Sequence, residues 1–573
     1  MKRNAWGHKK CTRQDSNLQQ RRRRPTFYPL DYGCALDYNT ITLLEITEIK
    51  GIIVVLHQKT DNNAGLRPMK ETMMTLLEQY KKLSKEIGYL GHAVSLMYWD
   101  MQTTAPEGGQ EKLSDSITYF STESFKKSTS DEFYNLVCKL CEPEEFDKLD
   151  DVYKFDISRA KRELDKSRRV PADFYEEYVK TTTASSMAWP KAKQSNDWNF
   201  YKPLLEKTIE AVKKYQGYRN PDKKVYDALI DQFEEGMTQE TIDRVFGELK
   251  EELVPMVEKI TAAPQPDHSK FTMFVPAHRQ AALCRFLVEY MGMDMTRFAQ
   301  AETEHPFTTS MSINDVRITN HYHENEVLAP IFSAIHEGGH ALFEQGVDQK
   351  YKDTEAAVIN YMGLHESQSR FYENILGRNI NFWKPIWPKV LEIVPEFKDV
   401  TLEDFVREIN HVENSFIRTE ADEVTYCLHI ILRYEVERAI FIDGVPVDEL
   451  PALWNKKMEE LLHLVPSTDA EGILQDMHWS DASFGYFPSY LLGSIYDGMF
   501  LEAIEADLGP VDDILAAGDI KKITAWLKEN IHRYGSTRTS SQVLEKVCNK
   551  ELSARPLINY FKKKYSEVYG LSL

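Results

Sequence analysis

The sequence predicts a mainly α-helical protein with one small β-sheet near the middle of the chain. From Met69 onward, apolar residues recur at helical spacing through most of the chain. One short stretch, from Ser312 to His323, instead alternates as a strand does. Neither internal repeats nor low-complexity tracts occur, so we expect one large body rather than a repeat array.

The expected helices follow one another along this body. The first is marked by an apolar stripe of Leu76, Leu77, Tyr80, Leu83, Ile87 and Leu90. Further amphipathic segments lie at 151–166, 199–216, 238–260 and 278–291. Thr401 and Asp404 indicate a capped helix start, and the inward face that follows consists of Phe405, Ile409 and Val412. The helical pattern is interrupted at Pro264 with Pro266, Gly444 with Pro446, and Pro466.

The composition is that of a globular protein and excludes one class of function. With 42% hydrophobic and 28% charged residues, the 573-residue chain can build a sizeable core. The net charge of −19 argues against a nucleic-acid binder, which needs a basic surface. Seven scattered cysteines are typical of a reducing compartment, and no apolar run reaches the roughly 18 residues of a membrane span. We therefore expect a cytoplasmic protein with neither nucleic-acid nor membrane partners.

The first 68 residues differ from the rest of the chain. They contain 12 Lys and Arg against 6 Asp and Glu, although the whole chain is acidic. The basic run Arg21–Arg24 is not followed by the apolar core and cleavage site of a secretory signal. Three interpretations stay open: a transit peptide, a basic tail, or an over-extended reading frame upstream of a true start at Met69, which we favour. We thus expect a disordered or mis-assigned extension at 1–68 and the functional domain at 69–573.

The strongest motif is His336-Glu337-Gly338-Gly339-His340. Its apolar neighbours predict a buried helix that ends near Gly346: Ile331, Phe332, Ile335, Leu342 and Phe343. Residues four apart project from one helix face, so both imidazoles can reach a single ion. Glu337 lies about 100° round the helix, where its carboxylate can hold metal-bound water. The alternative is a pair of core histidines spaced by chance. The two glycines are costly in a helix and favour close approach of a neighbouring strand.

A catalytic zinc needs a third protein ligand and one open position. Glu366, in His365-Glu366-Ser367-Gln368-Ser369, follows His340 after enough residues for a loop and a returning helix. We expect a zinc site of two histidines and one glutamate: His336, His340 and Glu366. His365 competes for the third position, and a surface glutamate is the alternative reading of Glu366. A second metal site at His321 and His323 is not expected, since no carboxylate or cysteine partner is evident.

Further ordered motifs accompany these two segments. They are Tyr98-Trp99-Asp100 with Thr103 and Pro106, His305-Pro306-Phe307, Asp315-Val316-Arg317-Ile318-Thr319, 417–423, 472–479 and 484–490. Together with H-E-G-G-H and H-E-S-Q-S, they resemble the carboxypeptidase Taq family of thermostable metallocarboxypeptidases. The resemblance extends from near Met69 to the C-terminus. Ala105, where family members have Met, departs from the pattern without touching the metal set.

This resemblance implies a fold similar to that of angiotensin-converting enzyme and neurolysin. In that fold, helices form two lobes around a deep substrate groove, with a short sheet beside the metal helix. The resemblance also implies a homodimeric enzyme that uses zinc, or cobalt. Such an enzyme releases single residues, with broad specificity, from peptides that have a free C-terminal carboxylate.

Roles can be assigned to several further residues. Glu337 is expected to take the proton of the metal-bound water and pass it to the leaving amine. The resemblance nominates Tyr486 and His478 as oxyanion donors, because the corresponding family regions look like the tyrosine and histidine that face the oxyanion in angiotensin-converting enzyme. In an aromatic-rich run, a core role is the alternative for Tyr486.

The terminal carboxylate of a substrate is best bound by a guanidinium group. Arg418 and Arg317 are the two candidates, and we rank Arg418 first. The alternatives are an intrahelical ion pair of Arg418 with Asp422 and a structural role of Arg317 on the predicted strand. His305 is a further candidate for lining the substrate site.

Two other functions compete with this reading. An endo-oligopeptidase would share the zinc chemistry but would also cleave peptides whose C-terminus is amidated. A binding or scaffold protein with a relic metal site would lack a catalytic group, whereas His336, Glu337, His340 and Glu366 are all present. We therefore favour the carboxypeptidase.

Overall fold

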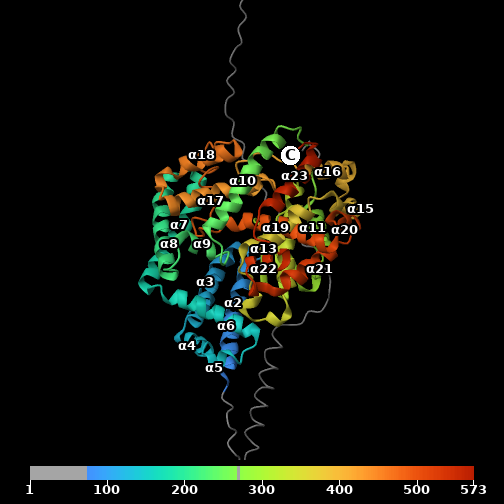
Figure 1. Ribbon diagram of the computed structural model, residues 1–573. Helices are drawn as coiled ribbons and strands as arrows, with labels where there is room; N and C mark the ends of the chain where they lie inside the picture. The colour runs from blue at the N-terminus through green and yellow to red at the C-terminus, as the bar shows by residue number, and fades with distance from the viewer. Residues whose placement is uncertain (1–73, 267–270) are drawn as a thin grey trace, which may run out of the picture. The chain divides into compact units, whose positions relative to one another are not determined.

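The computed structural model describes residues 74–266 and 271–573 (Figure 1). The expectations about residues 1–68 lie outside the described residues. The first half of the described chain contains helices α2 Leu76–Thr103, α3 Gln110–Ser128, α4 Asp131–Leu140, α5 Pro143–Phe146, α6 Asp151–Arg168, α7 Ala172–Ser195, α8 Trp198–Arg219, α9 Val225–Asp231, α10 Gln239–Thr261 and α11 Ala277–Met291. The second half contains α12 Leu328–Gly346, α13 Met362–Arg370, α14 Ile380–Trp383, α15 Trp387–Ile393, α16 Leu402–Ile409, α17 Thr425–Arg438, α18 Leu450–Leu462, α19 Phe487–Leu508, α20 Val511–Ala516, α21 Ile520–Asn530, α22 Ser540–Cys548 and α23 Arg555–Tyr569. The prediction of a mainly helical protein is confirmed.

Local capping explains where several of these helices begin. Thr75 and Glu78 form a reciprocal capping box at the start of α2. At α16, the Thr401 hydroxyl accepts a hydrogen bond from the backbone N–H of Asp404 at 3.0 Å, as the sequence predicted. Val412, predicted on the inward face of α16, is buried but lies beyond the end of that helix.

The sheet has three strands rather than one. β1 (Phe298–Glu302) pairs in parallel with β3 (Asp315–Asn320), and β2 (Thr308–Ser312) pairs antiparallel with β3, in the order β1-β3-β2. The single strand predicted from Ser312 to His323 is therefore wrong in its bounds. A two-residue connection between Ser312 and Asp315 reverses the chain, and such a short turn leaves the alternation in the sequence almost unbroken.

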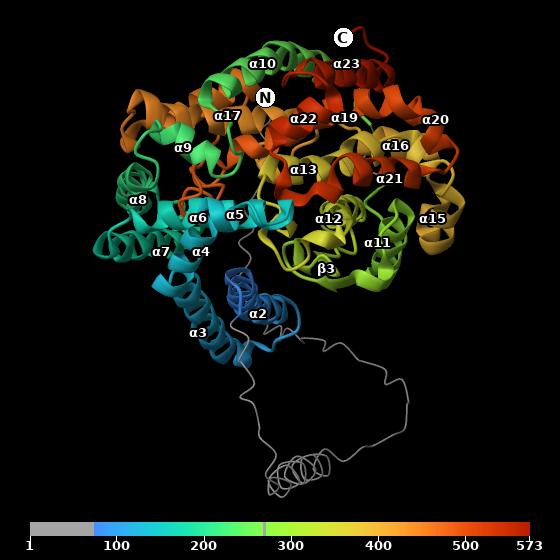
Figure 2. The same ribbon diagram turned by 60° about the horizontal axis from the view of Figure 1, so that its bottom comes forward.

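In the part of the chain that the structure describes, the buried apolar side chains form two separate clusters. The larger one runs through α7–α23 and the sheet. A smaller one joins α2, α4 and α6 through residues such as Tyr80, Val137 and Ile157. In the main cluster, α12, α13 and α19 pack side by side, and α12 also packs against β2 and β3 (Figure 2). This arrangement places the H-E-G-G-H helix between the sheet and the helix that carries Glu366.

Among residues 74–266 and 271–573, no helix has the length and hydropathy that crossing a membrane requires.

Candidate metal centre

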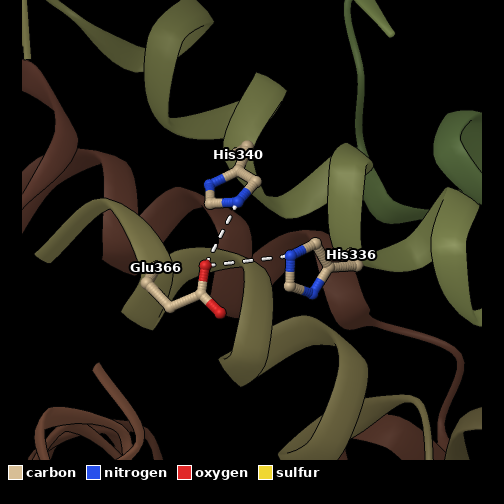
Figure 3. A group of neighbouring side chains, drawn as sticks. All are labelled: His336, His340 and Glu366. Carbon is tan, nitrogen blue, oxygen red and sulfur yellow. Dashed lines mark ion pairs between the residues drawn. The ribbon is translucent and has the colours of Figure 1, made fainter. Parts of the chain in front are cut away.

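Three predicted ligands from two helices lie together in the structure (Figure 3). His336 and His340 project from α12, and Glu366 projects from α13. The Oε2 atom of Glu366 lies 3.8 Å from Nε2 of His336 and 3.5 Å from Nε2 of His340. One donor atom from each residue falls within 4.8 Å of the others, and no second such group of three occurs among the described residues.

The donor set fits a divalent metal ion. Zinc bonds of about 2.0–2.2 Å in tetrahedral geometry place neighbouring ligand atoms roughly 3.3–3.6 Å apart. The distance of 3.5 Å from Glu366 to His340 falls within that range, and the distance of 3.8 Å to His336 lies slightly above it. Two imidazoles and one carboxylate also leave the fourth position open, as in catalytic rather than structural sites.

Hydrogen bonds orient both imidazoles toward this point. His336 Nδ1 donates to Oε2 of Glu373 at 2.8 Å, and His340 Nδ1 donates to the backbone carbonyl of His365 at 3.1 Å. Both Nε2 atoms are thereby left to face Glu366. His365, the competitor for the third ligand position, instead directs its Nε2 to Glu344 at 3.0 Å. Its backbone carbonyl is what orients the His340 ring.

Glu366 is held by Arg370, one helical turn farther along. Arg370 Nε donates to Oε1 at 2.7 Å, which leaves Oε2 to face the histidines. Burial raises the pKa of Glu366, but the Arg370 guanidinium and the His336 imidazole lower it by more. The carboxyl group is therefore ionised at neutral pH, as a metal ligand must be.

The glycines of the motif permit close helix packing. A Cβ atom on Gly339 would lie 2.7 Å from Cα of Ser369 and would also collide with the carbonyl of Gln368. The close neighbour of Gly339 is thus the α13 backbone, and the predicted strand at this position is wrong. Gly338 faces Val288 and Met291 of α11. Only a residue without a side chain lets α13 bring Glu366 this near to α12.

Glu337 lies on α12 between the two histidines but outside the group of three. Its side chain is buried, at 8% exposure, and burial raises the pKa of its carboxyl group. The Thr308 hydroxyl lies 2.5 Å from Oε2 of Glu337 and 3.0 Å from its backbone carbonyl. The carboxylate is therefore next to the candidate metal centre and anchored from β2.

Tyr486 and His478 lie beside each other, with ring centroids 5.6 Å apart. Burial and the nearby Glu366 carboxylate raise the pKa of Tyr486 to about 12, so its phenol stays protonated at neutral pH. Burial lowers the pKa of His478 to about 4, so its imidazole is neutral. His478 Nε2 lies 3.1 Å from the Tyr490 hydroxyl, while Nδ1 has no hydrogen-bond partner in the described part of the chain.

A buried carboxylate on α17 fixes the segment that carries these two residues. Glu437 accepts hydrogen bonds from Trp479 Nε1 at 2.8 Å and from the backbone N–H of Gly485 at 2.9 Å. Gly485 has a positive φ of 81°, and a Cβ there would lie 2.7 Å from the backbone carbon of Leu229. The turn before Tyr486 thus depends on glycine.

Arg418 belongs to a buried charge cluster. Its Nε and Nη2 donate to Oδ1 of Asp476 at 3.0 and 2.8 Å, and its Nη1 donates to the Tyr426 hydroxyl at 3.1 Å. Arg433, with a fully buried side chain, donates to the other oxygen of Asp476. The intrahelical pair of Arg418 with Asp422 is not observed, because Arg418 lies in a short 3₁₀ segment before α17 and turns to Asp476.

The other two substrate-site candidates lie elsewhere. Arg317 on β3 pairs with Asp315 of the same strand at 2.7 Å and lies over the Trp99 ring, 5.5 Å from its centroid. These contacts join α2 to the sheet. His305 is exposed in the connection before β2, and its backbone carbonyl accepts a hydrogen bond from Thr303. Neither residue forms a hydrogen bond or an ion pair with the three predicted metal ligands.

The charge cluster allows a stability prediction. Burial raises the pKa of Asp476, but Arg433 and Arg418 lower it by more and hold it below its usual range. A lowered pKa stabilises the fold above the usual value of about 3.9, and this stabilisation is lost as the pH falls. Asp476→Asn should cost about 3–5 kcal/mol in the free energy of unfolding at pH 7, because Arg433 loses its buried counter-charge.

Urea unfolding at several pH values measures this effect. The difference in the free energy of unfolding between Asp476→Asn and the unchanged protein should become smaller as the pH drops from about 5 to 3. The control is Asp448→Asn, which removes an exposed ion pair with Lys202 and should cost less than about 1 kcal/mol. If the two variants lose the same free energy of unfolding, the buried charge cluster does not stabilise the fold in the way described.

Several supporting residues were not found from the sequence. Glu373, Arg370 and Thr308 contact His336, Glu366 and Glu337, respectively. Arg370 and Glu373 follow Glu366 at helical spacings of four and seven, so a search for polar residues on the Glu366 face could have identified them. Thr308 carries no comparable signal, since its contact depends on how β2 packs against α12.

Comparisons with known proteins agree with this geometry. The description of the matching family is Carboxypeptidase Taq (M32) metallopeptidase, and the match covers residues 79–565. The chain is 41% identical over 499 residues to "Carboxypeptidase 1" of Bacillus subtilis (strain 168), covering 87% of this chain and 99% of that protein. It is 33% identical over 503 residues to "Thermostable carboxypeptidase 1" of Pyrococcus furiosus, covering 86% and 98%.

Solved structures show the same relationship. The M32 carboxypeptidase from Deinococcus radiodurans R1 superposes with a TM-score of 0.83 at 31% identity, covering 87% of this chain and all of that one. A Pyrococcus furiosus carboxypeptidase gives a TM-score of 0.80 at 33% identity, covering 86% and 99%. The similarity to angiotensin-converting enzyme and neurolysin stays a prediction. The fold, the convergent donor set and these relatives together show that the chain belongs to the carboxypeptidase Taq (M32) family and is a metallocarboxypeptidase.

Proposed function

We propose that this metallocarboxypeptidase is a zinc enzyme, with cobalt as an alternative metal, that releases single C-terminal residues of broad type from peptides. His336, His340 and Glu366 would hold the ion, and Glu337 would be the general base. The observation that carries the proposal is the convergence of three donor atoms within 4.8 Å, with a buried carboxylate adjacent to them on α12.

The chemistry follows from the positions of these side chains. A bound zinc ion supplies a Lewis acid that lowers the pKa of water and polarises the scissile carbonyl. Glu337 accepts the water's proton on its carboxylate and then delivers that proton to the leaving amine. The raised pKa of Glu337 suits the first transfer, because a stronger base takes the proton of the water more readily.

Tyr486 and His478 are proposed as donors to the oxyanion. A phenol with a pKa of about 12 and a neutral imidazole can each donate a hydrogen bond without bringing a full charge. The Nδ1 atom of His478 is free to donate if Nε2 accepts from Tyr490. Removing one such donor typically costs about 3 kcal/mol in transition-state stabilisation.

Arg418 is proposed to bind the terminal carboxylate, ahead of Arg317. Arg418 and Arg433 share the single carboxylate of Asp476, so this buried cluster keeps one net positive charge. Arg317, by contrast, is neutralised by Asp315. A buried unbalanced cation favours an anionic ligand, and the substrate's C-terminus is such an anion. His305 is kept as a proposed contact farther along the substrate.

Matched peptides with a free or an amidated C-terminus test this proposal. We expect the amidated peptide to lose about 10- to 100-fold in kcat/KM, because it lacks the charge that Arg418 would bind. Arg418→Gln should cause a similar loss for the free peptide and little further loss for the amide. Arg317→Gln is the matched control and should leave kcat/KM unchanged for both the free and the amidated peptide. Mass spectrometry of the products identifies the bonds that are cleaved.

Other results would favour a different function. Full activity on the amidated peptide, with internal cleavage products, would indicate an endo-oligopeptidase. No hydrolysis of any peptide by protein with a full equivalent of zinc would indicate a scaffold with a relic site. If the amidated peptide is cleaved and Arg418→Gln keeps full activity, the assignment of Arg418 to the terminal carboxylate would be wrong. The assignments of the metal ligands and the general base would not be affected.

The remaining expectations are part of the same proposal. We propose a cytoplasmic homodimer whose functional domain spans 69–573, with residues 1–68 unnecessary for turnover. The cysteine usage supports the compartment, and the family resemblance supports the dimer. The match of the family from residue 79 onward is consistent with the proposed domain start.

A further inference from the structure

Thr308 is placed to fix the orientation of Glu337. It is the first residue of β2, one of the two edge strands of the sheet, and β2 packs along α12. Its hydroxyl lies 2.5 Å from Oε2 of Glu337 and 3.0 Å from the Glu337 backbone carbonyl. Among residues 74–266 and 271–573, no other side chain donates a hydrogen bond to this carboxylate.

The Thr308 hydroxyl has one proton, which it can donate either to Oε2 of Glu337 or to the Glu337 backbone carbonyl. A carboxylate attracts a donor more strongly than a neutral amide carbonyl, and the shorter of the two distances is the one to Oε2. The backbone carbonyl of Glu337 also lies inside α12, where the helix supplies its own donor. The proton of Thr308 is therefore donated to Oε2.

The hydroxyl itself is held by the sheet rather than by a flexible loop. Thr308 pairs with Ile318 in the antiparallel ladder. The preceding residue, Phe307, donates its N–H to the Thr319 hydroxyl at 2.9 Å and accepts from the Thr319 N–H at 2.8 Å. Because Thr319 is fully buried, these contacts fix the start of β2 against the body of the protein.

We infer that Thr308 is a positioning residue for hydrolysis: it occupies Oε2 of Glu337 and leaves Oε1 to exchange the proton. The inference rests on the proposed role of Glu337 as general base. A glutamate side chain has three rotatable bonds, and Glu337 has a metal-ligand histidine on either side of it in the motif. Without the anchor, the carboxylate could swing toward the metal site or away from the water.

The test compares Thr308→Val with Thr308→Ser in the full-length, metal-loaded protein. Valine keeps the shape but removes the donor, and serine keeps the donor. We expect Thr308→Val to lower kcat about 10- to 100-fold, since a misplacement of about 1 Å costs up to about 10²-fold. KM, bound metal and the thermal midpoint should stay near those of the unchanged protein, and Thr308→Ser should recover most of kcat. Thr309→Val, on the opposite face of β2, is the matched control and should retain kcat.

Combination with Glu337→Gln separates this inference from the proposed function. If Thr308 acts through Glu337, adding Thr308→Val to Glu337→Gln should lower the residual rate by no more than about twofold. An inactive Glu337→Gln together with a fully active Thr308→Val would overturn the inference and leave the base assignment standing. An active Glu337→Gln would overturn the base assignment itself. Failure of serine to restore kcat, or loss of metal or folding in Thr308→Val, would show a merely structural role.

Discussion

A Glu337→Gln variant is expected to keep its metal and to lose about 10²- to 10⁴-fold in kcat. Glutamine has nearly the same shape but cannot accept the proton of the attacking water. Glu337 does not belong to the group of three donors, so the affinity for metal should be unchanged in the variant. The binding of an uncleaved peptide should also persist, because the proposed substrate contact is Arg418 rather than this side chain.

Steady-state kinetics measures the loss in kcat, and metal analysis of the same preparation measures the bound metal. The control is Glu326→Gln, which changes an exposed carboxylate just before α12 and should leave both quantities unaltered. A Glu337→Gln protein with full turnover would remove Glu337 from the base role. Loss of both metal and activity would instead place Glu337 among the ligands.

Glu366→Ala is expected to release the metal ion under mild chelation and to abolish turnover with it. The substitution removes one of three donors, and it also leaves the buried Arg370 without its 2.7 Å partner. Arg370 would then keep only its 4.0 Å ion pair with Glu373. Two imidazoles beside this guanidinium make a poor cation site, because the Glu366 carboxylate supplied the compensating negative charge. The loss of affinity should exceed that caused by any change to a supporting residue.

Chelator competition, followed by metal analysis, quantifies the affinity. Glu373→Gln is the comparison with a smaller expected effect: it keeps all three ligands, weakens the hydrogen bond to Nδ1 of His336 and removes the ion pairs with Arg370 and Arg378. It should reduce the metal affinity about 10- to 100-fold. At saturating zinc, Glu373→Gln should regain most turnover, whereas Glu366→Ala should not. Unchanged metal content in Glu366→Ala would disprove the third-ligand assignment.

The helical part of the site follows from local spacing. His336 and His340 are four residues apart in an apolar run, and any helix formed there puts both imidazoles on one face. The same reasoning placed Glu366 on a second helix, and the structure brings that helix alongside the first. The main helices of the body were found in the same way, because a period of 3.6 residues needs no knowledge of distant partners.

Contacts between distant segments were beyond this reasoning. Arg418 turns to Asp476, 58 residues away, rather than to Asp422 in its own segment. Gly339 meets the backbone of α13, where the sequence favoured a strand. β1 was missed, since its five residues pair in parallel with β3 and carry no alternation of buried and exposed positions.

The sequence alone determined the helical body, the two-histidine face and the second segment that offers a carboxylate. Only the tertiary structure decided which oxygen of Glu366 faces the histidines, which groups orient their rings and what anchors Glu337. The physical reason is that periodicity fixes the direction of a side chain relative to its own helix. The partner that it meets depends on how remote elements pack, and here Arg370, Glu373 and Thr308 take those places.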